Sequence, residues 1–217
     1  MAITVGTPAT GRGGTVENNN MPFDYTVPEG TKFLVYGVLC QFSGGSGGHD
    51  TCNWEGEAMT ILRHHAPTVR TMSIWGLVNP TAGAGTITVH HTFSTSPATA
   101  PFHWAVDLQG DFFSVARSLG DTKISQDDNP SIEYTASALA GIVFDSFWAN
   151  SQASPGAGQT AIHDNLDTAG FGRIGVSYKA HSGSNPTLSY TGATSAVYGG
   201  AEIIESFAPP PTDAFLL

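Results

Sequence analysis

Few residues in this chain of 217 could perform covalent chemistry. The stretch Gly44-Gly45-Ser46-Gly47-Gly48 matches the G-x-S-x-G pattern of a serine nucleophile. That pattern needs a preceding strand and a following helix, which hold the hydroxyl on a sharp turn. Here Asp50 and a second strand-forming segment follow, which indicates a hairpin tip. The acidic residues on expected strands have no spacing that pairs an acid with a base: Asp107, Glu133, Asp145 and Glu202. We therefore expect no enzymatic activity.

Metal-binding residue types occur in two patterns. The histidine pairs His64-His65 and His90-His91 lie in strand-like segments. Neighbouring side chains on a strand point to opposite faces, so such a pair does not chelate one ion without a bend. Asp164, Asn165 and Asp167 lie in an expected acidic loop and are weak candidates for a calcium site. Because Asp and Asn also favour turns for local reasons, the sequence predicts no cofactor and leaves calcium as an alternative.

Aromatic residues could bind a ligand by stacking. The chain has four tryptophans, and burial in a core is the simplest interpretation of them, since aromatic side chains bury the largest areas. Trp104 and Trp148 lie beside expected loops, so they are the candidates for contact with a sugar.

Composition limits the partners. Only 12% of the residues are charged and the formal net charge is −10. A nucleic-acid-binding protein needs clustered cations to displace counterions from phosphates, so no nucleic acid is expected. No apolar run reaches the ~18 residues that cross a membrane, so no membrane is expected either. Cys40 and Cys52 flank the glycine-rich loop, and both a disulfide and two buried thiols are consistent with their spacing.

The elements that would hold these residues are short strands. Phe23, Tyr25 and Val27 alternate with polar residues, and residues 33–40 form a continuous apolar run. Turn residues recur every 8–12 positions, which is typical of an all-β sandwich, and no helix and no internal repeat are expected. The predicted fold is an all-β, two-sheet antiparallel jelly-roll sandwich over residues 22–207, with an N-terminal arm or first edge strand over 1–21 and a Pro-rich tail over 208–217.

Several segments are similar to blocks of a concanavalin-like jelly-roll module of bacterial surface proteins and tailed-phage virion proteins. They are residues 33–38, 52–60, 74–83, 85–89 and 198–204. The resemblance covers mainly residues 33–89. It implies a scaffold fold and, because such a module carries many different sites, a function only by analogy.

The composition, the resemblance and the N-terminal sequence together favour a virion structural protein. Residues 1–8 have neither a cationic nor an apolar signal region, so we expect synthesis in the host cytoplasm without a signal peptide, followed by display on the virion surface. The hypothesis is a capsid decoration subunit, a cement or head-fibre protein, that forms homo-oligomers and binds the major capsid protein. Its arm and tail would make the contacts, with Phe215, Leu216 and Leu217 as anchors. The alternative is a carbohydrate-binding module or adhesin that binds a glycan, with or without calcium.

Overall fold

The protein consists of antiparallel β-strands. The computed structural model describes residues 3–13, 19–41, 48–66, 70–92, 101–111, 113–114, 119–137, 139–151, 153–167, 172–194 and 196–205, with the side chains of 165–167 left out. No helix occurs in these ranges. The strands of the first half are β1 (Thr4–Val5), β2 (Ala9–Arg12), β3 (Asn20–Val27), β4 (Phe33–Gln41), β5 (His49–Trp54), β6 (Glu57–Ala58), β7 (Thr60–His65), β8 (Arg70–Val78), β9 (Gly83–His91) and β10 (Phe102–Gln109). The strands of the second half are β11 (Leu119–Asp127), β12 (Ser131–Glu133), β13 (Gly141–Ala149), β14 (Ser154–Pro155), β15 (Thr160–Asp167), β16 (Gly172–His181), β17 (Thr187–Thr191) and β18 (Ala196–Ile204).

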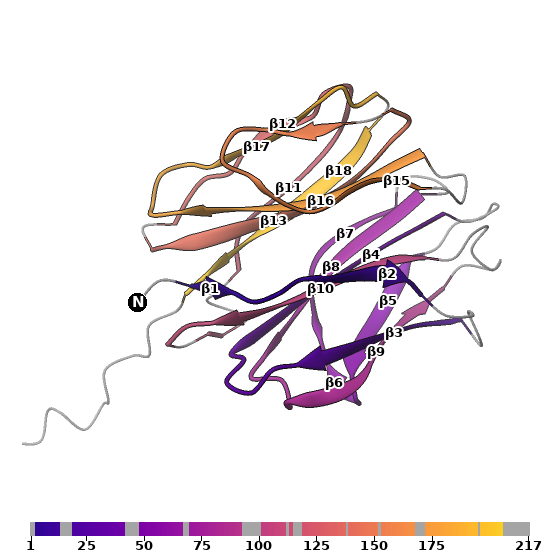
Figure 1. Ribbon diagram of the computed structural model, residues 1–217, viewed down its shortest axis with the longest axis vertical. Coiled ribbons are helices and arrows are strands. Elements are labelled where there is room, and N and C mark those ends of the chain that lie inside the picture. Colours follow the sequence, from indigo (N-terminus) through magenta and orange to yellow (C-terminus); the bar gives the residue numbers. More distant parts are fainter. Residues whose placement is uncertain are drawn as a thin grey trace, which may run out of the picture.

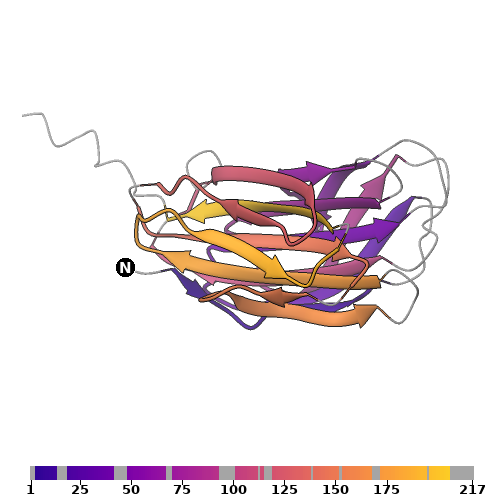
Figure 2. The same cartoon turned by 90° about the horizontal axis from the view of Figure 1, so that it is seen from above.

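The strands form four stacked sheets (Figure 1). The first outer sheet has the order β3-β9-β5-β6, and the first inner sheet has the order β1-β10-β4-β8-β7, with β2 also paired to β10. The second inner sheet follows with the order β11-β18-β13-β16-β15, and the second outer sheet with the order β12-β17-β14. Seen from above, many of the strands run lengthwise along the molecule (Figure 2). The all-β sandwich is confirmed, but the expected two sheets are four; the jelly-roll connectivity stays a prediction.

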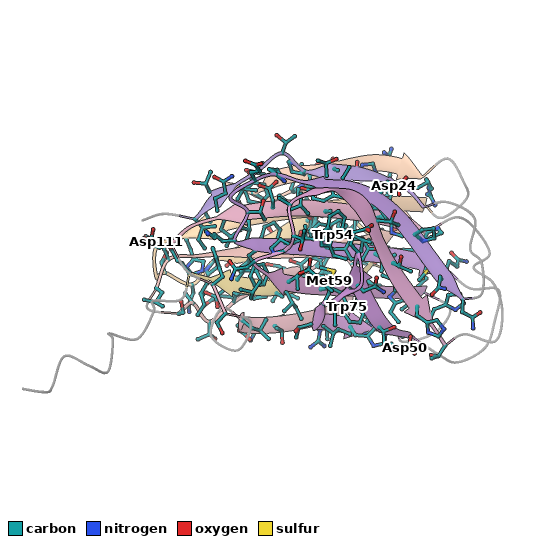
Figure 3. The ribbon with its side chains drawn as sticks, turned by 90° about the horizontal axis from the view of Figure 1, so that it is seen from below. Asp24, Asp50, Trp54, Met59, Trp75 and Asp111 are labelled. Carbon is teal, nitrogen blue, oxygen red and sulfur yellow. The ribbon has the colours of Figure 1, made fainter. Side chains whose placement is uncertain are left out.

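Three hydrophobic cores fill the spaces between the layers. Strand β4 illustrates this arrangement, because its successive side chains point alternately into the two cores on either side of its sheet. Phe33, Val35 and Leu39 face the middle core, whereas Leu34 and Tyr36 face the first outer core. The second outer core lies between the second inner and second outer sheets and contains Phe147 and Tyr198 among others. Trp54, Met59 and Trp75, labelled in Figure 3, belong to the first outer core and are buried.

The two halves have the same strand order. If β3, β4, β5, β7, β8, β9 and β10 are matched in sequence with β12 to β18, the pairings coincide. Strand β4 lies between β10 and β8, as β13 lies between β18 and β16. Strand β9 lies between β3 and β5, as β17 lies between β12 and β14. An irregular register follows Ile61 in β7 and Ala161 in β15, at matching places.

The prediction that the chain has no internal repeat is therefore wrong at the level of topology. The repeat escapes a reading of the sequence because a strand requires only alternating or continuous apolar residues, which many sequences supply. A short local trace remains in matching positions, Asp24-Tyr25-Thr26 in the first half and Glu133-Tyr134-Thr135 in the second.

The halves contact each other reciprocally. Strand β7 of the first half lies against β18 and β11 of the second. In the other direction, the ring of Phe102 on β10 lies 4.4 Å from that of His163 on β15. Because β7 matches β15 and β10 matches β18, each half presents the same elements to the other, as two subunits do in an isologous dimer.

Candidate functional site

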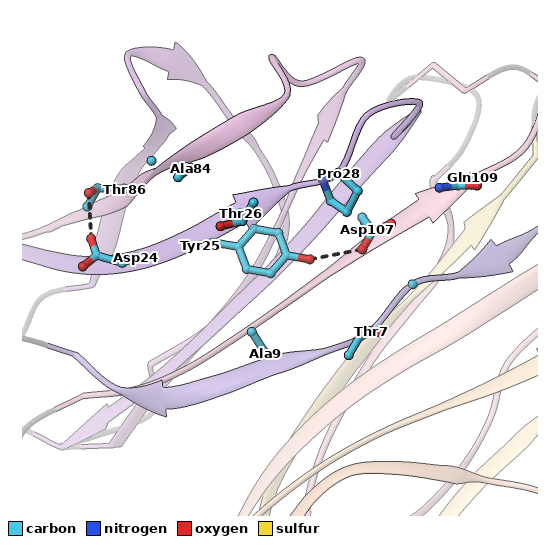
Figure 4. A pocket seen from close by; sticks show the side chains of 12 residues that line it. Thr7, Ala9, Asp24, Tyr25, Thr26, Pro28, Ala84, Thr86, Asp107 and Gln109 are labelled. Carbon is cyan, nitrogen blue, oxygen red and sulfur yellow. Dashed lines mark hydrogen bonds between the residues drawn. The ribbon is translucent and has the colours of Figure 1, made fainter.

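A surface hollow of about 890 Å³ lies among the described residues. It lies where the first outer sheet meets the edge of the first inner sheet, between β2, β3 and β10 (Figure 4). Hydroxyl, amide and carboxylate groups dominate its polar wall: Thr7, Asp24, Tyr25, Thr26, Thr86, Asp107 and Gln109. Small apolar residues complete it: Ala9, Pro28, Ala84 and glycines 6 and 85. The described residues that line it include neither lysine nor arginine, so the hollow is acidic.

Asp107 lies at the inner wall of the hollow. It is the one charged residue in the apolar run of β10, and only 2% of its surface is exposed. The Tyr25 hydroxyl donates a hydrogen bond of 3.2 Å to Asp107 Oδ1 (Figure 4). Burial, and then the neighbouring Asp107 carboxylate, raise the pKa of Tyr25 well above its ordinary value, so Tyr25 stays a donor.

Gly6, between β1 and β2, allows the edge of the first inner sheet to lie against the Asp107 carboxylate. Its N–H donates to the Asp107 backbone oxygen at 2.9 Å, and a Cβ atom at this position would overlap the Asp107 carboxylate. Only glycine allows the backbone to approach so closely.

The rim of the hollow carries a second carboxylate. Asp24 is exposed on β3 and lies opposite Thr86 of β9, whose hydroxyl donates to Asp24 Oδ1 at 2.8 Å. Asp24 and Asp107 therefore give the hollow one exposed and one buried negative group (Figure 4).

A different buried carboxylate lies in the second outer core. Asp145 Oδ1 accepts hydrogen bonds from the Ser177 amide, the Ser177 hydroxyl and the Tyr190 hydroxyl, and Oδ2 accepts one from Tyr198, all at 2.8–2.9 Å. Burial raises the pKa of Asp145 to about 6, although these donors act in the opposite direction. The group is enclosed on all sides and serves packing specificity rather than ligand binding.

A buried chain of polar groups connects Cys40, His49 and Ser73. Cys40 Sγ lies 3.0 Å from His49 Nε2, and His49 Nδ1 lies 2.7 Å from Ser73 Oγ. This resembles a cysteine nucleophile with its base, but the electrostatics oppose that role. Burial raises the pKa of Cys40 and lowers the pKa of His49, which favours a neutral pair, whereas a nucleophilic cysteine needs a lowered pKa. The spacing of Cys40 and Cys52 was consistent with a disulfide or with two buried thiols, and both are free buried thiols.

The two candidate tryptophans do not reach the surface. Trp104 and Trp148 are 0% and 1% exposed and belong to the middle core. Their proximity to loops suggested access to ligands, but the facing inner sheet covers both rings. This burial corrects their assignment as sugar-binding residues.

The other candidate residues lie elsewhere. Asp164, Asn165 and Asp167 belong to strand β15 and not to a loop, and Asp164 is exposed. No group of three or more His, Cys, Asp or Glu side chains that could hold a metal occurs within the described ranges. Phe215, Leu216 and Leu217, like Ser46 of the glycine-rich loop, lie outside the described residues.

Comparisons with known proteins do not assign a family. No family model, no curated protein and no solved structure matches the chain. In the part of the chain that the structure describes, no helix has the length and apolar character needed to cross a membrane.

The sequence placed Asp107 among the acidic residues on expected strands but gave it no partner. Its isolation within the run Trp104-Ala105-Val106-Asp107-Leu108 was the usable signal, because a lone acid in a buried strand requires a compensating donor. Neither Tyr25 nor the hollow could be inferred, since their positions depend on how β3 and β10 pack.

Proposed function

We propose that this protein is a structural protein of a tailed-phage particle, displayed on its surface as a capsid decoration subunit. The observation that carries the proposal is the tandem of two equivalent sandwiches held face to face by one continuous core. Such a block offers an extensive outer surface, which in our proposal binds neighbouring proteins of the particle. The resemblance of residues 33–89 to a virion module agrees with this role.

The outer surface is suited to repeated, individually weak contacts. Among the described residues, Ile61 is the one large apolar side chain that is clearly exposed. Contacts with a shell would therefore be mainly polar, and many copies on a symmetric lattice would gain occupancy through avidity.

The N-terminal residues make a different contact from the one expected of an arm. Strands β1 and β2 pair with β10 of the same chain, so they complete their own inner sheet. In our proposal the tail over 208–217 remains the segment that grips the major capsid protein, with Phe215, Leu216 and Leu217 as anchors.

The test uses phage particles from a strain in which this gene is deleted. Purified full-length protein should restore a fixed number of copies per particle, measured by quantitative mass spectrometry, at symmetric positions seen by electron microscopy. Replacing Phe215, Leu216 and Leu217 together by serine should reduce occupancy at least tenfold, whereas Glu29→Gln on an exposed turn should not. Failure of the unaltered protein to bind would overturn the virion role. Full occupancy by the triple variant would overturn the tail contact.

A glycan-binding module is the second candidate, favoured by the hydroxyl-rich wall of the hollow. Trp104 and Trp148 do not serve as a sugar-binding platform for this candidate function, since both rings are buried. Specific binding on a glycan array, lost on changing residues of the hollow, would favour this function over the virion role.

A further inference from the structure

The two halves of the molecule place an acidic residue at the same point. Asp107 on β10 lies opposite Leu34 of β4, and Glu202 on β18 lies opposite Val143 of β13. Leu34 and Val143 match because each follows the first middle-core residue of its strand, Phe33 and Ile142. The edge strand of each half passes the acid at a glycine, Gly6 or Gly120, whose Cβ would overlap the carboxylate.

In the second half, the chain itself supplies the partners of this acid. Glu202 is fully buried, and its oxygens accept hydrogen bonds from the Ser137 amide at 3.2 Å and the Asp121 amide at 3.0 Å. The side chain of His181, 2% exposed, places Nε2 2.7 Å from Glu202 Oε1. Two amides and an imidazole therefore surround the carboxylate.

In the first half, the positions that correspond to Ser137 and His181 do not supply these donors. Counting from the matched tyrosines Tyr25 and Tyr134, Pro28 stands where Ser137 stands, and proline has no N–H to donate. Asn79 follows the end of β8 at the place that His181 takes in β16, and its N–H donates to the Lys32 carbonyl.

Within the described residues, the one side-chain donor that reaches the Asp107 carboxylate is the Tyr25 hydroxyl, at 3.2 Å. A buried carboxylate with so few donors is costly unless another group binds it. The hollow opens at this point, and Pro28 lines it.

We propose that the hollow binds a compact cation with N–H donors, an ammonium or guanidinium group, and that Asp107 accepts its hydrogen bonds. Such a group would supply the hydrogen bonds that two amides make to Glu202 and the basic nitrogen that His181 places beside it. A charged N–H donor bound to a carboxylate forms one of the stronger hydrogen bonds in proteins. Asp24 adds a second negative charge at the rim, and the hydroxyls of Thr26 and Thr86 are available to further N–H groups. This site does not depend on the proposed virion role, because the hollow exists in the isolated chain.

The test is an NMR titration of the full-length protein with N-acetyl-arginine methylamide as the probe. The matched uncharged probe is N-acetyl-citrulline methylamide, which has a similar shape and no positive charge. We expect the arginine probe to shift the amide signals of Thr7, Thr26 and Thr86 in a saturable manner, and to bind at least tenfold more tightly than the citrulline probe. This comparison needs no variant. Equal binding of the two probes, or no shift of these amides up to the highest concentration of probe, would overturn the proposal.

Variants locate the site. Asp107→Asn keeps the size of the side chain and an acceptor for Tyr25, and it should weaken arginine binding at least tenfold. Pro28→Ser restores the residue type found at Ser137 and should also weaken binding, since the new amide competes for Asp107. Glu29→Gln, on the adjacent exposed turn, is the matched control and should bind normally. Unchanged binding by a folded Asp107→Asn variant would contradict the assignment, and so would displacement of the arginine probe by an uncharged methyl glycoside.

Discussion

Single buried acids make specific polar contacts within largely apolar strands of this molecule. Asp107, Asp145 and Glu202 are each 2% exposed or less, and each lies in a mainly apolar strand. They differ in what satisfies them. Hydroxyls and an amide surround Asp145, an imidazole and amides surround Glu202, and a tyrosine beside a hollow serves Asp107.

Asp145 should make stability depend on pH in a characteristic direction. Its pKa is about 6 in the folded state and about 4 when unfolded, so the folded state holds the proton more tightly. The stability from this group is therefore full below about pH 4 and is lost as the pH rises to about 6, by about 3 kcal/mol. Asp145→Asn, which does not titrate, should not lose this contribution.

The measurement is the free energy of unfolding in urea from pH 4 to pH 7. The difference between Asp145→Asn and the wild type should move in favour of the variant as the pH rises. Buried His49 and His103, whose pKa values burial lowers, act in the opposite direction in both proteins and cancel in the difference. Glu29→Gln serves as the control. A difference that does not change with pH would contradict the prediction.

At the scale of the elements, strand β4 carries much of the architecture. It lies at the centre of the first inner sheet and supplies residues to two cores. Gly37 lies opposite Trp104 in the sheet, and a Cβ atom at Gly37 would overlap the indole ring. The indole ring of Trp104 therefore occupies the space that a side chain at Gly37 would take.

Gly37→Ala should therefore destabilise the protein by about 1–3 kcal/mol, because the ring has no other space in a packed core. Gly11→Ala is the matched control, since Gly11 also lies in a strand and its added Cβ would meet Phe23 at an ordinary 3.5 Å. Chemical denaturation should show a clear loss for the first variant and little change for the second. Equal stabilities would show that the core around Trp104 is loosely packed.

At the scale of the whole molecule, the middle core joins the two sandwiches. Trp104 of the first half and Phe144 of the second stack with their centroids 6.0 Å apart. Arg70 of β8 lies 5.5 Å from the centre of the Trp148 ring and donates to Asn150 of the second half at 3.1 Å. These contacts should make the halves unfold as one unit.

Phe147→Ala tests this cooperativity. Phe147 is buried in the second outer core, where its ring lies 4.1 Å from that of Tyr190. The truncation should cost about 3–5 kcal/mol. Native-state hydrogen exchange should report the same loss for the slowest amides of β9, which lies two sheets away from β13. Ile61→Ala, at an exposed position, should have a small effect. Unchanged exchange in β9 would mean that the halves unfold independently.

Local pattern predicted the strands well. The apolar run at 33–40 became β4, and the alternating residues Phe23, Tyr25 and Val27 lie in β3. Strand β11 was not foreseen, because its sequence is polar and it lies at the edge of a sheet, where one face and one side need no apolar partner. The candidate ligand-binding residues were predicted poorly, since their exposure depends on which sheet covers them.

The sequence by itself determined the class of structure. Apolar alternation, β-branched runs and turn residues act over a few neighbouring positions, and they suffice to specify short antiparallel strands and to exclude helices. Only the tertiary structure decided that the strands form two equivalent sandwiches, that Trp104 and Trp148 lie between them, and that Asp107 faces a hollow while Glu202 is enclosed. The physical reason is that these features arise from pairing and packing between residues far apart in the chain, for which strand patterns carry little information.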